Sequence, residues 1–315
     1  HILFGVMVNI LITGGAGYIG SRLINQLSIT PNIHITSLDT YMFDQKIKSN
    51  TKNITYLRGD VRDEKLIQEL IKKNDVFIPL AAYVGAPLCK KFPKETEEIN
   101  YKAVEFMCGK LSKDQRVLMP VTNSGYGIGE KDKFCDETSP LKPISLYGKT
   151  KVMAEDIIMQ RENSISFRLA TVFGVSERMR IDLLVNNFTY IACFEKKLEI
   201  FEPHFRRNYI HISDISRAFI FALDNFQKLK GEIFNLGLSN ANLTKEQLCM
   251  KIQDVIKDFE YIIVPEGEDP DKRDYFVSNK KIESKGFMAK FSLEDGISEL
   301  YKYYLSDKFT PSKNY

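Results

Sequence analysis

A glycine-rich segment near the N-terminus places the strongest constraint on how this chain folds. The segment Gly14–Gly20 separates a short apolar run from a stretch with helical periodicity. In such a strand–turn–helix unit, Gly14 permits the tight turn, Gly17 lets the backbone approach a diphosphate, and Gly20 allows close helix packing. The N–H groups and the dipole of the helix then face the phosphate groups. A glycine triplet alone suits an ordinary loop, but this context predicts a dinucleotide-binding site.

The first half of the chain alternates apolar runs with helical patterns. This alternation predicts right-handed βαβ units and a Rossmann-type, doubly wound parallel sheet covered on both faces, which is an α/β fold. Strands are expected at Val8–Ile12, Ile33–Leu38, Ile54–Leu57, Val76–Leu80 and Val117–Val121, and helices at Tyr18–Leu27, Asp63–Lys72 and Glu97–Leu111.

The second half is less regular, and it predicts a smaller C-terminal substrate-binding lobe. We expect residues 7–170 to form the dinucleotide-binding domain, with 208–228 returning to it, and residues 171–207 and 229–315 to form the lobe. Helices are expected at Tyr147–Gln160, Ile181–Cys193, Ile215–Leu223, Leu243–Ile256 and Leu293–Tyr304, and extended segments at Ser166–Leu169 and Phe205–Ile212.

Composition excludes several classes of protein. Lys and Arg total 44 and Asp and Glu total 41, so a formal charge of +3 gives no reason to expect a nucleic-acid partner. No run of 18 or more apolar residues is present, so no membrane-spanning helix is expected. The four histidines lack metal-ligand spacing, and the five cysteines are odd in number with no C-x-x-C pair. These features predict no metal site and reduced thiols in a cytoplasmic protein.

Residues 1–6 precede the first predicted strand. This opening is apolar, but it has neither a basic region nor a cleavage site with small residues, so a secretory signal peptide is not favoured. We interpret it as a short extension that lies outside the fold.

An acidic residue at the end of the second strand indicates which dinucleotide binds. Asp39 follows Gly20 by 19 residues, as in dinucleotide-binding βαβ units. A carboxylate there accepts hydrogen bonds from the ribose hydroxyls and repels a 2′-phosphate. The expected cofactor is therefore NAD rather than NADP.

A tyrosine and a lysine four residues apart are the candidate catalytic pair. Tyr147 and Lys151 share one face of a predicted helix. A free tyrosine has a pKa near 10, and a nearby ammonium and a positive nicotinamide ring would favour the phenolate, so we expect a lowered pKa and general-base catalysis. An isolated pair of this spacing would more simply be a surface pair. Here the glycine segment precedes it, and a strand ending in Thr122 lies between the two.

Together these motifs resemble the extended short-chain dehydrogenase/reductase family, which contains nucleotide-sugar epimerases, dehydratases and dehydrogenases. The resemblance covers about two-thirds of the chain. The matching positions are Gly14–Gly20, Asp39, Gly59, Asp60, Val61, Leu80, Ala81, Ala82, Asn100, residues 122–127, Tyr147, Lys151, Arg168 and residues 207–211.

The resemblance implies roles for several of these residues. Thr122 would hydrogen-bond the sugar hydroxyl that is oxidised, and Lys151 would bond the nicotinamide ribose. A homodimer built on the helices at 97–111 and 147–160 is also implied. The remaining cofactor contacts implied are Tyr18 and Ile19 in the glycine segment, Asp60 and Val61 at the adenine, Leu80, Ala81 and Ala82 along the cofactor, and Asn100 near it.

Two departures from the family pattern narrow the activity. Dehydratases carry Asp-Glu directly after the threonine, whereas this chain has Asn123 and Ser124, so a 4,6-dehydratase is not expected. Epimerases often have asparagine where this chain has Thr171. A nucleotide-sugar 4-epimerase remains the alternative, and a non-catalytic NAD-binding scaffold is a minor one because the Tyr147/Lys151 pair is intact.

Three further strings resemble the GDP-heptose 4-dehydrogenases of capsule heptose synthesis. They lie at residues 83–89, 122–129 and 267–275. This closer resemblance implies oxidation of a C4 hydroxyl to a ketone on a GDP-sugar, with the cofactor reoxidised in a separate step.

A sugar nucleotide carries a diphosphate and therefore requires cationic side chains. Arg207 matches the phosphate-binding arginine of the family, and Arg273 is the second candidate, since guanidinium groups suit phosphate oxygens. Arg178, Arg180 and Arg206 are weaker candidates that would equally suit a solvated basic face. The substrate contacts expected are Thr122, Asn123, Ser124, Arg180, Asn187, Arg207 and Arg273.

Overall fold

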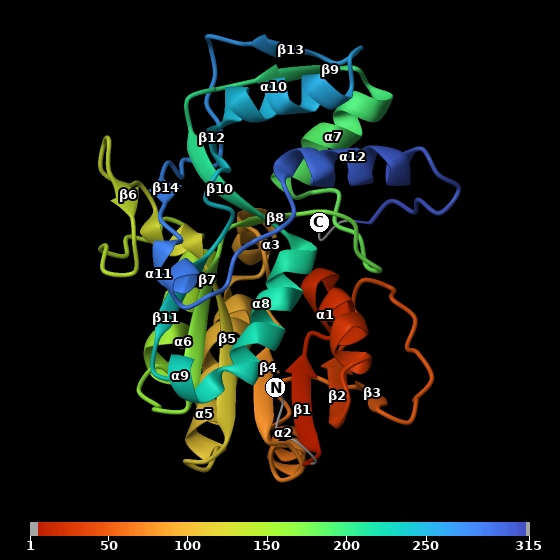
Figure 1. The fold of residues 1–315 in the computed structure, drawn as a ribbon, viewed down its shortest axis with the longest axis vertical. Coiled ribbons are helices and arrows are strands. Elements are labelled where there is room, and N and C mark those ends of the chain that lie inside the picture. The colour runs from red at the N-terminus through yellow and green to blue at the C-terminus, as the bar shows by residue number, and fades with distance from the viewer. Residues whose placement is uncertain (1–5, 313–315) are drawn as a thin grey trace.

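The computed structural model describes residues 6–312, so the predicted N-terminal extension lies outside the described residues except for Val6. A parallel sheet of seven strands forms the lower part of the molecule in Figure 1, with the order β11-β7-β5-β4-β1-β2-β3. The predicted Rossmann-type fold is confirmed. The strands are β1 (Val8–Thr13), β2 (Ile33–Asp39), β3 (Ile54–Arg58), β4 (Val76–Pro79), β5 (Arg116–Thr122), β7 (Ser164–Leu169) and β11 (Ile233–Leu236).

Helices cover both faces of this sheet because the side chains of its buried strands are apolar on both sides. In β1, Ile10 and Ile12 pack in the core with Leu23 of α1, whereas Leu11 packs in a second core with Ile67 of α2. The first core is covered by α1 (Tyr18–Ser28), α8 (Ile212–Asp224), α9 (Phe226–Leu229) and α11 (Lys280–Ser284), and the second by α2 (Glu64–Ile71), α5 (Ala103–Lys110) and α6 (Leu146–Ile158).

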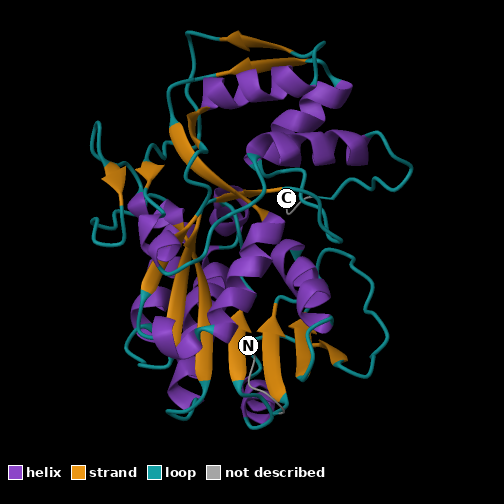
Figure 2. Ribbon diagram, in the orientation of Figure 1, coloured by secondary structure: helices purple, strands orange, loops and turns teal. Residues whose placement is uncertain are grey.

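A second group of elements packs above the carboxyl ends of the sheet strands (Figure 2). Its three helices enclose a separate apolar core. The helices are α7 (Leu184–Phe194), α10 (Lys245–Val255) and α12 (Leu293–Tyr304). The strands form three small sheets: β8 (Thr171–Phe173), β10 (Arg206–His211) and β12 (Asn242–Thr244); β9 (Lys197–Ile200) and β13 (Glu260–Ile263); β6 (Phe134–Cys135) and β14 (Phe276–Val277).

Some predicted boundaries are wrong, and the causes are local. The helix predicted at Glu97–Leu111 begins earlier, as α4 (Pro93–Glu97), because proline suits the first helical position. It then passes through a π-helical turn at Glu98–Lys102 before α5. Leu243 belongs to β12, since Thr244 caps α10 and exchanges hydrogen bonds with Gln247 in a capping box.

The order of the strands fixes where a ligand can bind. β1 pairs with β2 on one side and with β4 on the other, so the chain reverses direction across the sheet at this point. Loops that leave β1 and β4 separate there and open a crevice at the carboxyl ends of the strands. A short helix, α3 (Ala86–Lys91), follows the loop after β4.

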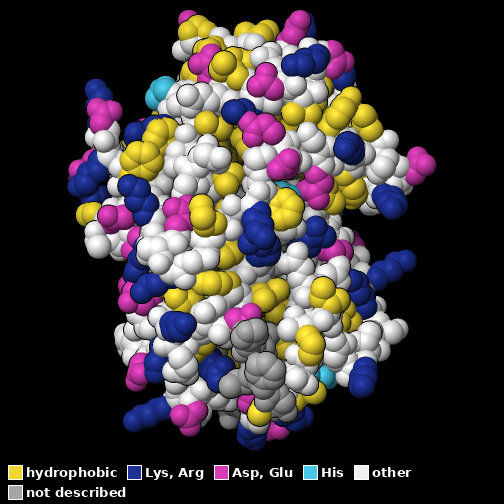
Figure 3. Space-filling view, viewed as in Figure 1, with side chains coloured by type: hydrophobic (Ala, Val, Ile, Leu, Met, Phe, Trp, Pro, Cys, Tyr) yellow, Lys and Arg dark blue, Asp and Glu magenta, His cyan; other side chains and the backbone are white. Residues whose placement is uncertain are grey.

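The described surface is mixed in charge. On the face shown in Figure 3, Lys and Arg side chains lie among Asp and Glu side chains. This distribution agrees with the small net charge of +3. Within residues 6–312, no helix combines the length and apolar character needed to cross a membrane.

Candidate functional site

A cavity of about 840 Å³ lies at the crevice predicted by the strand order. It brings together residues that are far apart in the sequence, from the first glycine motif to the loop before β14. Of the predicted site residues, its wall contains Gly14, Gly17, Tyr18, Ile19, Asp39, Asp60, Val61, Leu80, Ala81, Ala82, Thr122, Ser124, Tyr147, Lys151, Arg180, Asn187, Arg207 and Arg273. Two predicted residues, Asn100 and Asn123, do not line it.

The glycine segment forms a cradle that larger residues would fill. Gly14 has a positive φ of 73°, and a Cβ there would lie 2.6 Å from the backbone nitrogen of Ala81. A Cβ on Gly20 would lie 2.3 Å from the carbonyl oxygen of Gly14. The N-terminus of α1 therefore comes close to the strand ends and faces the cavity. This geometry fits the diphosphate of a dinucleotide.

The carboxylate of Asp39 is held at the end of β2 by backbone groups. Its two oxygens accept hydrogen bonds from the N–H of Ala16 at 3.0 Å and of Tyr41 at 2.9 Å. A carboxylate has about four acceptor positions, so ribose hydroxyls can still bond to it. The carboxylate of Asp60, in contrast, pairs with the side chain of Arg62 at 2.7 Å, and this pairing lowers the pKa of Asp60.

The candidate catalytic pair projects from the first turns of α6. The helix begins after Ser145, whose hydroxyl accepts a hydrogen bond from the N–H of Gly148. Desolvation in the cavity wall raises the pKa of Tyr147 to about 12, although Arg180 and Arg273 lower it in part. This direction is opposite to the predicted lowering, and Lys151 is not among the groups that lower this pKa. Lys151 is itself buried, which lowers its pKa to about 8.

Thr122 and Ser124 lie beside this pair at the end of β5. The hydroxyl oxygen of Thr122 accepts a hydrogen bond from the N–H of Ser124 at 3.0 Å, and the same hydroxyl donates to the hydroxyl oxygen of Ser124 at 2.9 Å. A hydrogen bond with Thr122 is one of the influences that lower the pKa of Tyr147. A short 3₁₀ turn, Asn123–Tyr126, keeps the two hydroxyl groups together. Both hydroxyl groups can therefore position a hydroxyl of a ligand near the phenol.

The two asparagines outside the cavity wall differ in their surroundings. Asn100, in the π-helical turn, bonds the N–H of Tyr83 at 2.8 Å and its carbonyl oxygen at 2.9 Å. Its amide also reaches Thr150 of α6 at 3.3 Å, so it ties the loop after β4 to the helix that carries Tyr147. Asn123 is buried, and its amide has no hydrogen-bond partner among the described residues.

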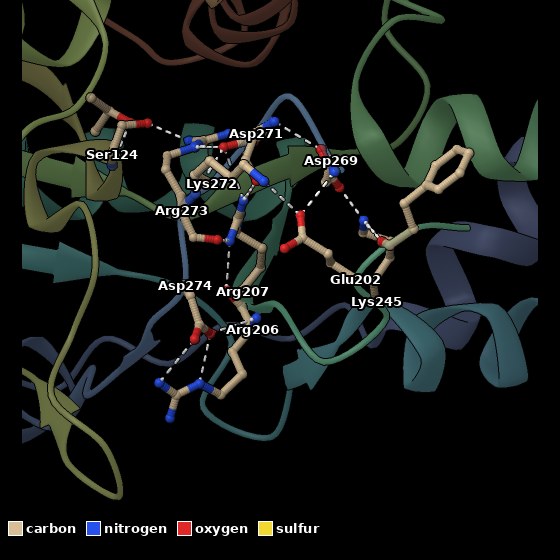
Figure 4. Close-up of polar contacts among 12 residues, drawn as sticks. Ser124, Glu202, Arg206, Arg207, Lys245, Asp269, Asp271, Lys272, Arg273 and Asp274 are labelled. Carbon is tan, nitrogen blue, oxygen red and sulfur yellow. Dashed lines mark hydrogen bonds and ion pairs between the residues drawn. The ribbon is translucent and has the colours of Figure 1, made fainter. Parts of the chain in front are cut away.

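Arginines and lysines supply the positive charge of the cavity, and most of the arginines are ion-paired. Arg207 and Arg273 both contact Asp271, as Figure 4 shows. Arg180 is buried and pairs with Asp182. Arg206 does not line the cavity, and it pairs with Asp274 at 2.8 Å.

Arg178, a weaker candidate from the sequence, lines the cavity. It is buried rather than part of a solvated basic face, and its guanidinium lies 4.6 Å from the ring centre of Phe43. Burial, with Arg180 nearby, lowers its pKa to about 10. The chain therefore closes this side of the cavity with a cation stacked on an aromatic ring.

Several other cavity residues could not be identified from the sequence. Asp269 and Asp271 lie in one of the strings that resemble the heptose dehydrogenases, but only Arg273 of that string is predicted as a contact. Tyr83 likewise begins one of these strings without being predicted as a contact. Nothing in the sequence around Phe43 or Lys245 distinguishes these two residues from surface positions, yet all three line the cavity.

Comparisons with known proteins agree with this geometry. Residues 10–237 match the model of the "NAD dependent epimerase/dehydratase family". The chain is 24% identical to human dTDP-D-glucose 4,6-dehydratase over 323 aligned positions, which cover 95% of this chain and 91% of that protein. It is 27% identical to UDP-glucose 4-epimerase of Lactobacillus helveticus, covering 84% and 87%. The solved structure of UDP-glucose 4-epimerase from Thermus thermophilus, in complex with NAD, shares the fold with a TM-score of 0.81 at 20% identity, covering 95% and 100%.

Proposed function

The chain belongs to the NAD-dependent epimerase/dehydratase family, and from this premise we propose that it oxidises the C4 hydroxyl of a nucleotide-activated sugar to a ketone. It is an enzyme, and its cofactor is NAD. The observation that carries the proposal is that Tyr147 and Lys151 line the same cavity as the glycine cradle. A reacting sugar carbon held beside Tyr147 would therefore also lie in the cavity that receives the dinucleotide.

The roles proposed for the residues follow from their positions. NAD, when bound, supplies the hydride acceptor and a positively charged ring. Tyr147 accepts the proton of the C4 hydroxyl, and Thr122 orients that hydroxyl. Lys151 holds the nicotinamide ribose, and Arg180 and Arg273 favour the phenolate. Asp39 and the glycine cradle hold the adenosine and diphosphate parts of the cofactor.

Loss of water from the sugar is not supported by the groups beside Thr122. A 4,6-dehydratase needs an acid and a base at the two positions that follow the threonine in this family. Asn123 is buried outside the cavity wall, and Ser124 is bonded to Thr122 and Arg273. Neither an amide nor a serine hydroxyl exchanges protons readily near neutral pH.

The nucleotide sugar that we favour is a GDP-heptose, on the resemblance of three strings to GDP-heptose 4-dehydrogenases. Arg207 and Arg273 would bind its diphosphate, with Arg180 and Asn187 near the remainder of the substrate. All four side chains line the cavity. A homodimer that pairs α5 and α6 of each subunit is part of the same proposal.

A 4-epimerase is the second candidate, because two of the compared proteins are named UDP-glucose 4-epimerase. The two activities differ in the fate of the hydride. The NAD-loaded enzyme is mixed with GDP-, UDP- and dTDP-sugars, NADH absorbance is followed, and the sugar products are identified. Net NADH with a 4-keto sugar supports the dehydrogenase, and a C4 epimer without net NADH supports the epimerase. A 6-deoxy-4-keto product, or no turnover of any sugar, would contradict the proposed activity.

A further inference from the structure

The carboxylate of Asp271 pairs with the two arginines that are proposed to bind the substrate diphosphate, Arg207 and Arg273. Asp271 Oδ1 lies 3.1 Å from Nη2 of Arg207 and 2.7 Å from Nε of Arg273. Its second oxygen lies 2.5 Å from Nη2 of Arg273. Figure 4 shows the carboxylate among these guanidinium groups, and all three residues line the cavity. The protein therefore carries its own anion at the proposed phosphate site.

This carboxylate is ionised and reaches solvent. Burial opposes ionisation, but Arg273 and Arg207 hold the pKa of Asp271 well below its usual range. The side chain of Asp271 is 41% exposed, whereas that of Arg207 is only 6% exposed. Two guanidinium groups and one carboxylate leave a local charge of 2 − 1 = +1. A ligand anion must compete with Asp271 for the donors of both arginines.

Arg207 is also held by hydrogen bonds that do not involve the Asp271 carboxylate. Its Nη1 donates hydrogen bonds to the carbonyl oxygen of Arg206 at 2.8 Å and to that of Arg273. Because these bonds do not involve the carboxylate, they can keep the guanidinium in place when the carboxylate moves. Arg273 in turn donates to the hydroxyl of Ser124, beside Thr122.

The segment that carries Asp271, which we term the strap (residues 267–274), is fixed on both sides of it. Before Asp271, the carboxylate of Asp269 pairs with Lys245 of α10. After it, Lys272 pairs with Glu202 at 2.9 Å, and Asp274 pairs with Arg206. The Asp271 side chain can therefore leave the arginines without release of the strap.

We propose that Asp271 is a specificity-determining residue, an internal anion that competes with ligand phosphates for Arg207 and Arg273. A diphosphate has enough charge and length to bond both arginines, so it replaces the carboxylate at little loss. A single phosphate bonds fewer donors and gains less when it displaces the carboxylate. Asp271 thus favours diphosphates because it weakens the binding of smaller anions, so the specificity arises from competition and repulsion by the carboxylate. This inference rests on the proposed function, because it requires a diphosphate at this site.

The test measures binding of nucleotides to the NAD-saturated enzyme, so that the glycine cradle is already filled. Asp271→Asn removes the charge and keeps the shape, and Asp271→Ser is measured beside it in case the first variant folds poorly. We expect Asp271→Asn to bind GDP or UDP about five- to tenfold more tightly and GMP or UMP by a larger factor. The preference for diphosphate over monophosphate should therefore fall. Calorimetric titration gives each Kd.

Two control variants separate charge from shape and position. Asp271→Glu keeps the charge and should leave both Kd values within about twofold of the wild type. Asp274→Asn removes an arginine-paired carboxylate from the same strap but outside the cavity wall, and it should have equally little effect. Unchanged or weaker binding of GDP and UDP by both Asp271→Asn and Asp271→Ser would overturn the role of Asp271. If the wild type binds neither nucleoside diphosphate, the proposed phosphate site itself is wrong and the inference falls with it.

Discussion

Tyr147 and Lys151 lie one turn apart on α6, and burial shifts the pKa of each toward its neutral form. The pKa of Tyr147 is raised to about 12, and that of Lys151 is lowered to about 8. The cations that favour the phenolate are Arg180 and Arg273. The protein alone therefore keeps the phenol protonated, and the charges that would activate it gather on the side of the cavity proposed to bind substrate.

The first prediction concerns the base itself. Tyr147→Phe removes the phenolic oxygen and little volume, so the cavity keeps its shape and NAD should bind with nearly unchanged affinity. Turnover should fall by about 10²–10⁴-fold, which is the usual contribution of a positioned general base. Steady-state kinetics with the active nucleotide sugar and calorimetric titration with NAD measure the two quantities. Turnover that survives this substitution would show that another group accepts the proton.

The second prediction concerns the stability of the fold against pH. The pKa of Lys151 is lowered from 10.5 to about 8 by burial. Below pH 8 the lysine is charged in both the folded and unfolded states, and the fold bears the cost of a buried charge. As the pH rises from 8 toward 10.5, the folded state releases its proton first, so stability increases with pH. The full gain is about 3.5 kcal/mol, at about 1.4 kcal/mol for each pKa unit.

Lys151→Met lacks this titration and serves as the reference. The melting temperature of the wild type should rise relative to that of Lys151→Met between pH 8 and pH 10. The comparison stops at pH 10 because the raised pKa of Tyr147 then lowers stability as the pH increases further. A constant difference between the two proteins across this range would show that Lys151 does not titrate there.

The third prediction compares two glycines. Gly14→Ala forces a Cβ to within 2.6 Å of the Ala81 backbone at a positive φ, so it should abolish NAD binding and lower the melting temperature. Gly109→Ala, in α5, meets no atom within 4 Å, and alanine is the better helix former. This control should raise stability by about 0.5–1 kcal/mol and leave NAD binding unchanged. Equal effects of the two substitutions on NAD affinity would contradict the cradle.

Much of the fold could be predicted because its signals are local. The apolar runs at Val8–Ile12 and Ile33–Leu38 are short and bounded by turns, and both form sheet strands. The short strands β9 and β13 were not predicted, because each has only four residues, too few to establish a period, and β13 is largely exposed. Such strands depend on a partner distant in the sequence.

The residues of the candidate site also fall into two groups: those that a local motif locates and those that the packing of distant segments brings together. Residues within one motif, such as Gly14 and Asp39, follow from backbone requirements and could be located from spacing. The position of Asp271 between two arginines depends on how the loop before β14 folds over β10, which no local pattern encodes. In the protein alone the pKa of Tyr147 is raised, because the desolvation of its side chain depends on the packed cavity wall. The predicted lowering also included the charge of the nicotinamide ring.

The fourth prediction concerns the choice of cofactor. Asp39→Asn keeps the size of the side chain but removes its charge, so the ribose hydroxyls lose charge-assisted hydrogen bonds, and NAD affinity should fall about tenfold. Repulsion of a 2′-phosphate disappears with the carboxylate. Because Arg178 lies close enough to feel the charge of Asp39, its guanidinium would then attract that phosphate. Calorimetric titration should therefore show weaker binding of NAD and stronger binding of NADP, so the preference for NAD should fall. If the ratio of the two Kd values does not change, Asp39 does not contact the ribose, and the selectivity must come from elsewhere in the cavity.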